Sequence, residues 1–134
     1  MSDSAELLIE READIVAARQ KGREIAAAIG FSSTEQTFIA MGISEIARNI
    51  LVYAKRGSVA ITEIEELGRR GVRIVATDHG PGIPDIALAM RDGYSTNKSL
   101  GLGLPGTKRL MDEFVIESEV GVGTRVTMQK WRRR

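Results

Sequence analysis

Residues 58–78 read SVAITEIEELGRRGVRIVATD, and this stretch decides how the remaining elements are arranged. Apolar residues alternate with polar ones over residues 58–65 and again over residues 71–78, which is the period of half-buried β-strands. The segment Gly68-Arg69-Arg70-Gly71 separates the two runs. Because glycine readily adopts the positive φ angles of tight turns, the stretch predicts a β-hairpin.

The N-terminal part of the chain predicts a strand followed by two helices. A short apolar run indicates the strand, over residues 5–12. Residues 14–29 carry apolar side chains at helical spacing, with Asp14 as the expected N-cap and Gly30 as the expected end. The second helix is expected over residues 33–55.

That second helix begins with the spacing of a capping box, Ser33 followed by Gln36. Most of its remaining positions are apolar. Because exposing apolar side chains to water is unfavourable, we expect this helix to be buried on most sides.

The C-terminal part predicts two helices and a second hairpin around an aperiodic loop. The strands then come in pairs along the chain, and paired strands favour antiparallel pairing. We therefore predict an α/β two-layer sandwich, with a mixed, mostly antiparallel sheet and helices on one face. The expected elements are a short helix over residues 84–91, a mobile loop over residues 92–102, a helix over residues 103–112, and strands over residues 114–118 and 124–131.

Composition narrows the classes of function. With 134 residues and a net charge of +1, the chain has the size of one domain, expected over residues 1–134, and no field that would attract nucleic acid. The absence of cysteine and the single histidine exclude thiolate and zinc sites. No apolar run approaches the ~18 residues that cross a bilayer, so we expect a cytoplasmic protein with no membrane contact.

Glu45 and Asn49 lie four residues apart in the second predicted helix and therefore project from the same face. One interpretation is structural, with Glu45 paired to Arg48 on a solvated edge. The other is chemical: the side-chain carbonyl of Asn49 is a hard oxygen ligand for Mg²⁺, an ion that completes its shell with waters and nucleotide phosphates. Glu45 would then lie near the γ-phosphate and accept a proton from the attacking group.

Asp78 ends a predicted strand and is followed by Gly80 and Gly82. The segment could be no more than a turn. A carboxylate beside a backbone without side chains also suits a flat base whose exocyclic amine donates to the acid, and adenine fits this description better than guanine.

The segment Gly101-Leu102-Gly103-Leu104-Pro105-Gly106 surrounds a predicted helix N-terminus, where free N–H groups and the helix dipole attract an anion. It lacks the Gly-Lys-Ser/Thr of a P-loop and the preceding strand of a dinucleotide-binding fingerprint. Glycine-rich flexibility alone would also explain it. Lys98 could reach the phosphates or be an ordinary surface lysine.

Thr124 follows Gly121 and Gly123 and opens the last predicted strand. It could be only a strand-opening β-branched residue. As part of the same site, its hydroxyl could bond the Asp78 carboxylate or the base, directly or through water. The single histidine, His79, is interpreted as a loop residue.

Taken together, the segments resemble the sequence boxes of the Bergerat-fold (GHKL) ATPases, a superfamily that includes gyrase, MutL and the histidine kinases. Residues 45–49 are similar to its N box, residues 78–82 and 101–106 to its two glycine boxes, and residues 121–124 to its final element. The resemblance covers roughly residues 35–128.

Among stand-alone members, the chain is similar to the anti-sigma-factor type of serine/threonine kinase, and most similar to the stressosome switch kinases. Such a kinase phosphorylates a serine or threonine of a STAS-domain antagonist or scaffold protein, and then leaves it for another partner, often a phosphatase. The resemblance implies ATP and Mg²⁺ as cofactors and a role in a bacterial stress or sigma-factor pathway. The segments that carry it are residues 81–86, 92–96, 101–114 and Lys130-Trp131.

The same resemblance implies a role for each site residue. Glu45 is expected to be the general base, Asn49 to hold Mg²⁺ and Asp78 to bind adenine. His79 stands where the family often has asparagine, in a variable slot. The residues expected to bind nucleotide through the glycine boxes and the mobile ATP lid over residues 92–102 are Gly80, Gly82, Lys98, Gly101, Leu102, Gly103, Leu104, Gly106 and Thr124.

Two alternative functions remain open at this level. A non-catalytic interaction protein, such as an anti-sigma factor, could use the nucleotide only to set its shape. The catalytic fragment of a histidine kinase is the other, although no dimerisation helix pair precedes the domain.

Overall fold

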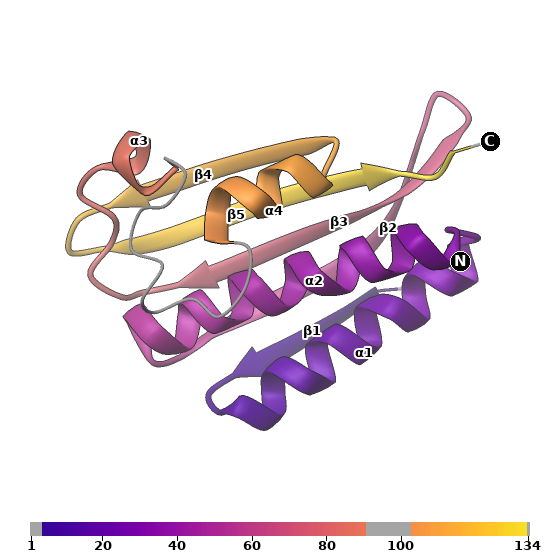
Figure 1. The fold of residues 1–134 in the computed structure, drawn as a ribbon. Helices are drawn as coiled ribbons and strands as arrows, with labels where there is room; N and C mark the ends of the chain where they lie inside the picture. Colours follow the sequence, from indigo (N-terminus) through magenta and orange to yellow (C-terminus); the bar gives the residue numbers. More distant parts are fainter. Residues whose placement is uncertain (1–3, 91–102, 134) are drawn as a thin grey trace.

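The computed structural model describes residues 4–90 and 103–133. Helices α1, α2 and α4 lie over one face of an antiparallel sheet (Figure 1), which confirms the predicted two-layer α/β sandwich. The predicted loop over residues 92–102, with Lys98, Gly101 and Leu102, lies outside the described residues. The elements are β1 (Ser4–Ile9), α1 (Glu12–Ile29), α2 (Ser33–Asn49), a π-helical segment η1 (Ile50–Ala54), β2 (Gly57–Glu66), β3 (Arg69–Asp78), α3 (Ile86–Ala89), α4 (Gly103–Leu110), β4 (Glu113–Glu119) and β5 (Gly123–Trp131).

The strand order in the sheet is β1-β2-β3-β5-β4, and all four pairings in the described residues are antiparallel. The last strand in sequence, β5, therefore lies between β3 and β4. Its register places Thr124 opposite Asp78 and Val126 opposite Ala76. Because alternate residues of a strand share a face, these four side chains lie together at one end of the sheet.

The β2–β3 hairpin is present, but its turn differs from the prediction. Leu67 and Gly68 form a two-residue turn with φ angles of 53° and 78°. Arg69 and Arg70, expected in the turn, instead belong to β3. Positive φ at both positions is the requirement of the type I′ turn, whose twist matches that of the flanking strands. Leu67 meets this requirement while 90% exposed, so its side chain is not constrained by packing.

The start of α1 corrects the expected N-cap. Arg11 is the N-cap, and Asp14 lies in the first turn. The Asp14 carboxylate accepts the backbone N–H groups of Glu10 at 2.9 Å and Arg11 at 3.1 Å. These bonds draw residues 10 and 11 into the approach to the helix, so β1 ends at Ile9 rather than at residue 12. The expected end of α1 is confirmed, since Gly30 has a φ of 104°.

The start of α2 shifts by one residue from the prediction. Ser32, not Ser33, is the N-cap, and its Oγ accepts the N–H of Glu35 at 3.1 Å. The Glu35 carboxylate accepts the N–H of Ser32 in return, at 3.3 Å, which completes a capping box that does not involve Gln36.

Helix α2 lies between α1 and α4 over the middle of the sheet, roughly along its strands (Figure 1), and supplies the centre of the core. The expected burial on most sides holds for its second half, whereas Ser33, Thr34, Thr37 and Met41 are exposed. The prediction of one regular helix to residue 55 was wrong, because the chain changes to a π-helical turn at Ile50, directly after Asn49. A π-turn adds a residue to the helical loop, and such turns are frequent at functional sites. Lys55 ends it with a φ of 72°. The buried side chains of α2 and η1 are Ile39, Ala40, Ile43, Glu45, Ile46, Ala47 and Ile50.

Within the described residues, no helix is both long enough and apolar enough to cross a membrane.

Lys130 is a buried cation that holds the C-terminal end of α4. Its side chain is 7% exposed, its Nζ donates to the carbonyl of Leu110 at 2.7 Å, and it lies 5.7 Å from the ring centroid of Phe38. A positive charge at the last carbonyl of a helix satisfies an acceptor that the helix itself cannot satisfy. The side chain thus joins β5, α4 and α2.

We predict that Lys130→Met lowers the free energy of unfolding by about 1–3 kcal/mol, because the Leu110 carbonyl loses a charged donor inside the protein. Urea unfolding followed by circular dichroism measures this change. The control is Lys21→Met, which removes a more exposed lysine paired with Glu24 and should change the free energy by less than about 0.5 kcal/mol. Equal effects of the two substitutions would contradict the role of Lys130.

Candidate functional site

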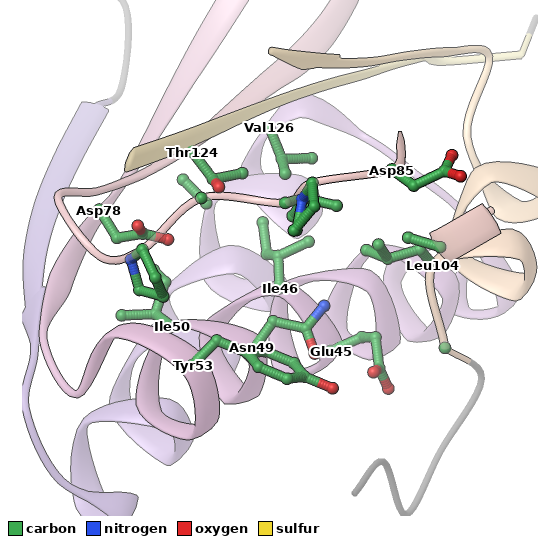
Figure 2. A pocket seen from close by; sticks show the side chains of 17 residues that line it. Glu45, Ile46, Asn49, Ile50, Tyr53, Asp78, Asp85, Leu104, Thr124 and Val126 are labelled. Carbon is green, nitrogen blue, oxygen red and sulfur yellow. The ribbon is translucent and has the colours of Figure 1, made fainter. Parts of the chain in front are cut away.

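A pocket of about 400 Å³ lies between α2 and the end of the sheet where Asp78 and Thr124 meet (Figure 2). This volume is in the range of sites that bind small molecules. Its walls come from α2 and η1, from the ends of β3 and β5, from the loop after β3, and from the start of α4. The predicted site residues that line it are Glu45, Asn49, Asp78, Gly82, Gly103, Leu104 and Thr124.

Glu45 and Asn49 form the polar part of the α2 wall. The predicted common face is confirmed, since both side chains line the pocket (Figure 2). Glu45 is 4% exposed, so it does not lie on a solvated edge. Arg48 instead reaches Glu12 of α1, with 3.2 Å between Nη1 and Oε1. The structural interpretation, in which Glu45 pairs with Arg48 on a solvated edge, was therefore wrong.

Asp78 lies at the end of β3, on the opposite side of the pocket from α2 (Figure 2). Its Oδ1 accepts the N–H of Gly80 at 2.9 Å, which bends the chain away from the strand. Its Oδ2 has no hydrogen-bond partner within the described residues. One carboxylate oxygen therefore shapes the loop, and the other is available to a ligand.

Gly80 is not a wall of the pocket, contrary to expectation. It lies against Ala54, where a Cβ on Gly80 would be 2.6 Å from the Cβ of Ala54. The glycine allows the loop to approach the π-helical segment closely, so its contribution is to packing. His79 is exposed in the same loop, as expected of a loop residue.

The loop after β3 is fastened to the β4–β5 hairpin. The Pro81 carbonyl accepts the N–H of Gly121 at 2.9 Å, and the N–H of Ile83 donates to Ser118 Oγ at 2.7 Å. Gly82 lies between these two bonds with a φ of 82°, and a Cβ there would be 2.5 Å from the carbonyl oxygen of Glu119. Only glycine fits this contact and this φ together. The sequence Pro81-Gly82-Ile83 is thereby held along the pocket.

Thr124 lines the pocket, but a direct bond to Asp78, one of the partners expected for its hydroxyl, is not formed between these two described residues. Its Oγ1 lies 2.8 Å from Ser118 Oγ, and no hydrogen bond between it and Asp78 is found in the described part of the chain. Ser118 therefore holds both the loop, through Ile83, and the hydroxyl of Thr124. Its side chain organises one wall without lining the pocket itself.

Helix α4 brings its first residues to the pocket. Gly103 has a φ of 70°, and Leu104 follows it on the wall. Gly106, expected at the site, is instead buried within α4 beside Thr107 and away from the pocket. Gly106 lies three residues after Gly103, on the same side of α4 but one turn further from the pocket. That second turn is buried against the rest of the protein.

Several residues of the wall were missed by sequence reasoning. Helical spacing could have predicted three of them, because residues three or four positions from Asn49, or from one another, share its side of α2 and η1. These are Ile46, Ile50 and Tyr53. Ala76 and Val126 follow from alternation, since they lie two residues from Asp78 and Thr124. The contributions of the loop after β3 and of α3 had no periodic signal. These missed residues are Pro81, Ile83, Pro84, Asp85 and Ala89.

Comparison with known proteins gives the following similarities. Residues 9–130 match the family described as "Histidine kinase-like ATPase domain". The chain is 50% identical over 133 residues to "Serine/threonine-protein kinase RsbT" of Bacillus subtilis, which covers 99% of this chain and 100% of that protein. It is 34% identical over 106 residues to "Anti-sigma F factor" of Geobacillus stearothermophilus, covering 74% of this chain and 71% of that protein.

The fold is similar to that of a solved structure, the RsbU and RsbW domains of a protein from Mycobacterium tuberculosis. The TM-score is 0.66 with 21% sequence identity, over 98% of this chain and 33% of that chain. At this identity the similarity concerns the fold alone.

We predict that Ser118→Ala loosens the wall formed by the loop after β3. The Ile83 N–H loses its acceptor, so the free energy of unfolding should fall by about 1–3 kcal/mol and the amides of residues 82 and 83 should exchange faster with solvent. Hydrogen exchange followed by mass spectrometry measures the second effect.

The matched control is Ser58→Ala, which removes a strand hydroxyl on the face of the sheet away from the helices. It should leave exchange of the loop amides unchanged. Unchanged loop exchange in Ser118→Ala would show that the serine does not hold the loop.

Proposed function

This chain belongs to the histidine kinase-like ATPase domain family, and we propose that it transfers the γ-phosphate of ATP to a serine or threonine of a STAS-domain protein. It is a serine/threonine-protein kinase of that family, since the 50% identity to a named serine/threonine kinase extends over 99% of the chain. The family is an ATPase family, so the chain binds ATP. The roles of individual residues, the metal and the partner belong to the proposal.

The observation that carries the proposal is the arrangement of three polar side chains in one pocket. Glu45 and Asn49 lie on adjacent turns of one helix, and Asp78 lies at the end of the strand facing them. A nucleotide needs these two kinds of group at separate ends, an acceptor for its base and oxygen ligands near its phosphates. The apolar side chains between them, Ile46, Ile50 and Val126, suit the flat faces of a base.

We propose that the Asp78 Oδ2 atom accepts a hydrogen bond from the exocyclic amine of adenine. The other oxygen, Oδ1, is already engaged by the Gly80 N–H. Gly82 contributes its backbone to the pocket wall, since the position of its missing side chain faces Glu119 of the hairpin, so a planar ring can lie against this backbone. Thr124, opposite Asp78, presents a hydroxyl whose orientation is set by Ser118.

The donor set around Asn49 fits a magnesium ion that is held mostly by its nucleotide. The described residues contain no cluster of three carboxylate or imidazole groups that could hold a metal alone. Mg²⁺ accepts one or two protein oxygens and takes the rest of its shell from phosphates and waters, and the Asn49 carbonyl is such an oxygen. When bound, the ion would neutralise charge on the phosphates.

We propose Glu45 as the general base of the transfer. The substrate hydroxyl oxygen forms a bond to the γ-phosphorus, the bond from that phosphorus to the bridging oxygen of ADP breaks, and the hydroxyl proton moves to the Glu45 carboxylate. Glu45 is 4% exposed, so few water molecules compete with the substrate hydroxyl for its carboxylate. The backbone N–H groups at the start of α4 stabilise charge on the phosphates.

The partner is proposed from the same similarity. A kinase of this type would dock a STAS-domain protein, phosphorylate one hydroxyl and release the product, and we propose a phosphatase as its next partner. No nucleic acid or membrane is needed for this cycle, and we propose that it operates in the cytoplasm.

A non-catalytic anti-sigma factor is the second candidate, favoured by the 34% identity to a protein of that name. Both functions use a nucleotide pocket, so the pocket does not separate them. Incubation with ATP, Mg²⁺ and a recombinant STAS-domain protein does, since only the kinase leaves a phosphoserine or phosphothreonine detectable by mass spectrometry.

We predict that Glu45→Gln and Glu45→Ala lower the rate of phosphotransfer by about 10²–10⁴-fold, the usual contribution of a general base. ATP binding, measured by calorimetry, should persist in both variants, because the carboxylate is not proposed to hold the nucleotide. Glu24→Gln, at an exposed carboxylate of α1, is the control and should keep the rate. A Glu45 variant that transfers phosphate at the unmodified rate would remove Glu45 from this role.

For the base end of the pocket, we predict that Asp78→Asn lowers the affinity for ATP about tenfold or more, equivalent to one charged hydrogen bond. The asparagine oxygen can still accept the Gly80 N–H, so the loop should keep its conformation. The asparagine amide nitrogen would face the exocyclic amine of adenine, and because both groups are donors the hydrogen bond is lost. The preference for ATP over GTP should shrink for the same reason. Calorimetry with both nucleotides tests this, and an unchanged ratio of affinities would contradict adenine recognition by Asp78.

A further inference from the structure

Helix α4 is held in place by residues that do not touch the pocket, although its first residues line it. Gly103 and Leu104 are wall residues, whereas Thr107 is fully buried. At the other end, Lys130 binds the carbonyl of Leu110. A change in how α4 packs on the rest of the protein, a contact called its seat below, therefore moves a wall of the pocket.

The seat of α4 on α2 is at Gly42. A Cβ on Gly42 would be 2.7 Å from Met111 Cε and 3.6 Å from Thr107 Cγ2, so the two chain segments meet where α2 has no side chain. Gly42 precedes Glu45 by three residues and Asn49 by seven, which places all three on one face of the helix. The contact that seats α4 is thus rigidly connected to the two polar residues of the α2 wall.

The hydroxyl of Thr107 connects this seat to the first turn of α4. Thr107 Oγ1 donates to the carbonyl of Gly103 at 2.9 Å, and the side chain is 0% exposed. Gly103 has a left-handed φ of 70°, so it is the residue at which the chain turns into the helix. A threonine that bonds back to the carbonyl four residues earlier adds a second donor to that carbonyl and tilts the peptide, which bends the turn.

We propose that Thr107 is a positioning residue for the phosphate end of the nucleotide. Its hydroxyl sets the tilt of the first turn of α4, and its methyl seats that turn near Gly42 on the face that carries Glu45 and Asn49. The N–H groups of the turn are thereby aimed at the phosphates, while the base end at Asp78 is unaffected. This inference rests on the proposed nucleotide site, and Thr107 itself contacts no nucleotide.

Two variants of Thr107 separate positioning from stability. Thr107→Val keeps the shape and removes the hydroxyl, whereas Thr107→Ser keeps the hydroxyl and removes a buried methyl. We expect Thr107→Val to lower the affinity for ATP with Mg²⁺ about tenfold, the effect of one lost or misdirected charged hydrogen bond. Its affinity for AMP, which lacks the outer phosphates, should change by less than about twofold.

Thr107→Ser should behave in the opposite way. Loss of the buried methyl lowers the urea midpoint of unfolding more than Thr107→Val does, yet ATP affinity stays within about threefold of that of the unmodified chain. ATP affinity is measured by calorimetry, and AMP affinity by displacement of a fluorescent ADP analogue. A residue that only stabilised the fold would change ATP and AMP binding together and in proportion to the loss of stability.

Gly42→Ala tests the seat independently of Thr107. The added methyl would be 2.7 Å from the end of the Met111 side chain, which must move, and 3.6 Å from Thr107 Cγ2. We expect the displaced Met111 to disturb the packing of Thr107 and to lower ATP affinity more than AMP affinity. The matched control is Gly22→Ala, which adds the same methyl between α1 and α2, against the end of the Ile43 side chain, away from α4. It should lower stability without changing the ratio of ATP to AMP affinity.

Equal losses of ATP and AMP affinity in Thr107→Val, or a loss in Thr107→Ser as large as in Thr107→Val, would overturn the positioning role while leaving the nucleotide site intact. If the unmodified chain bound neither nucleotide, the proposed site would fail and this role with it. If Thr107→Val did not fold, Gly42→Ala compared with Gly22→Ala would decide, since equal ratios in that pair also overturn the role.

Discussion

The packing of α2 against the middle of the sheet is the constraint on which the rest of the structure depends. Ile39, Ile43 and Ile46 are buried on one side of the helix against the strand residues of the core. Exposing one such side chain costs about 1.5–3 kcal/mol, so the helix cannot rotate about its axis without losing a large part of the stability of a small domain. The direction in which Glu45 and Asn49 point follows from that fixed rotation. The polar wall of the pocket is therefore a consequence of how the apolar side of the same helix packs.

The other walls of the pocket are held from outside it. Ser118 bonds both the Ile83 N–H and the hydroxyl of Thr124, and Gly121 bonds the Pro81 carbonyl, so the β4–β5 hairpin holds the loop after β3. Lys130 holds the far end of α4 in a comparable way. Ser118 lies in β4 and Lys130 in β5, at the far side of the sheet from β1, and Gly121 lies in the turn between these strands. Together they hold a short loop and a short helix in place. The two shortest walls of the pocket, the loop after β3 and the start of α4, are thus held by bonds from β4, β5 and the turn between them.

The separation of polar groups in the pocket agrees with the chemistry of the family. Asp78 lies at the end of β3, and Glu45 and Asn49 lie on α2, with apolar side chains between them. An acceptor at one end and oxygen ligands with a carboxylate at the other are what a nucleotide with a reactive terminal phosphate requires. The chain is similar both to a relative named as a kinase and to relatives named as anti-sigma factors.

The sequence by itself determined the two-layer fold, the paired strands and the common face of Glu45 and Asn49, because these depend on periodicity along a single segment. It also placed Asp78 at a strand end, since an alternating run stops there. Only the tertiary structure decided that Thr124 bonds Ser118 instead of Asp78, that Gly80 packs on Ala54, and that Gly106 faces the protein. It also decided that Glu45 is buried while Arg48 pairs with Glu12 of α1. Those outcomes depend on which segments meet in space, and a local pattern holds no information about a neighbour that is distant in the chain.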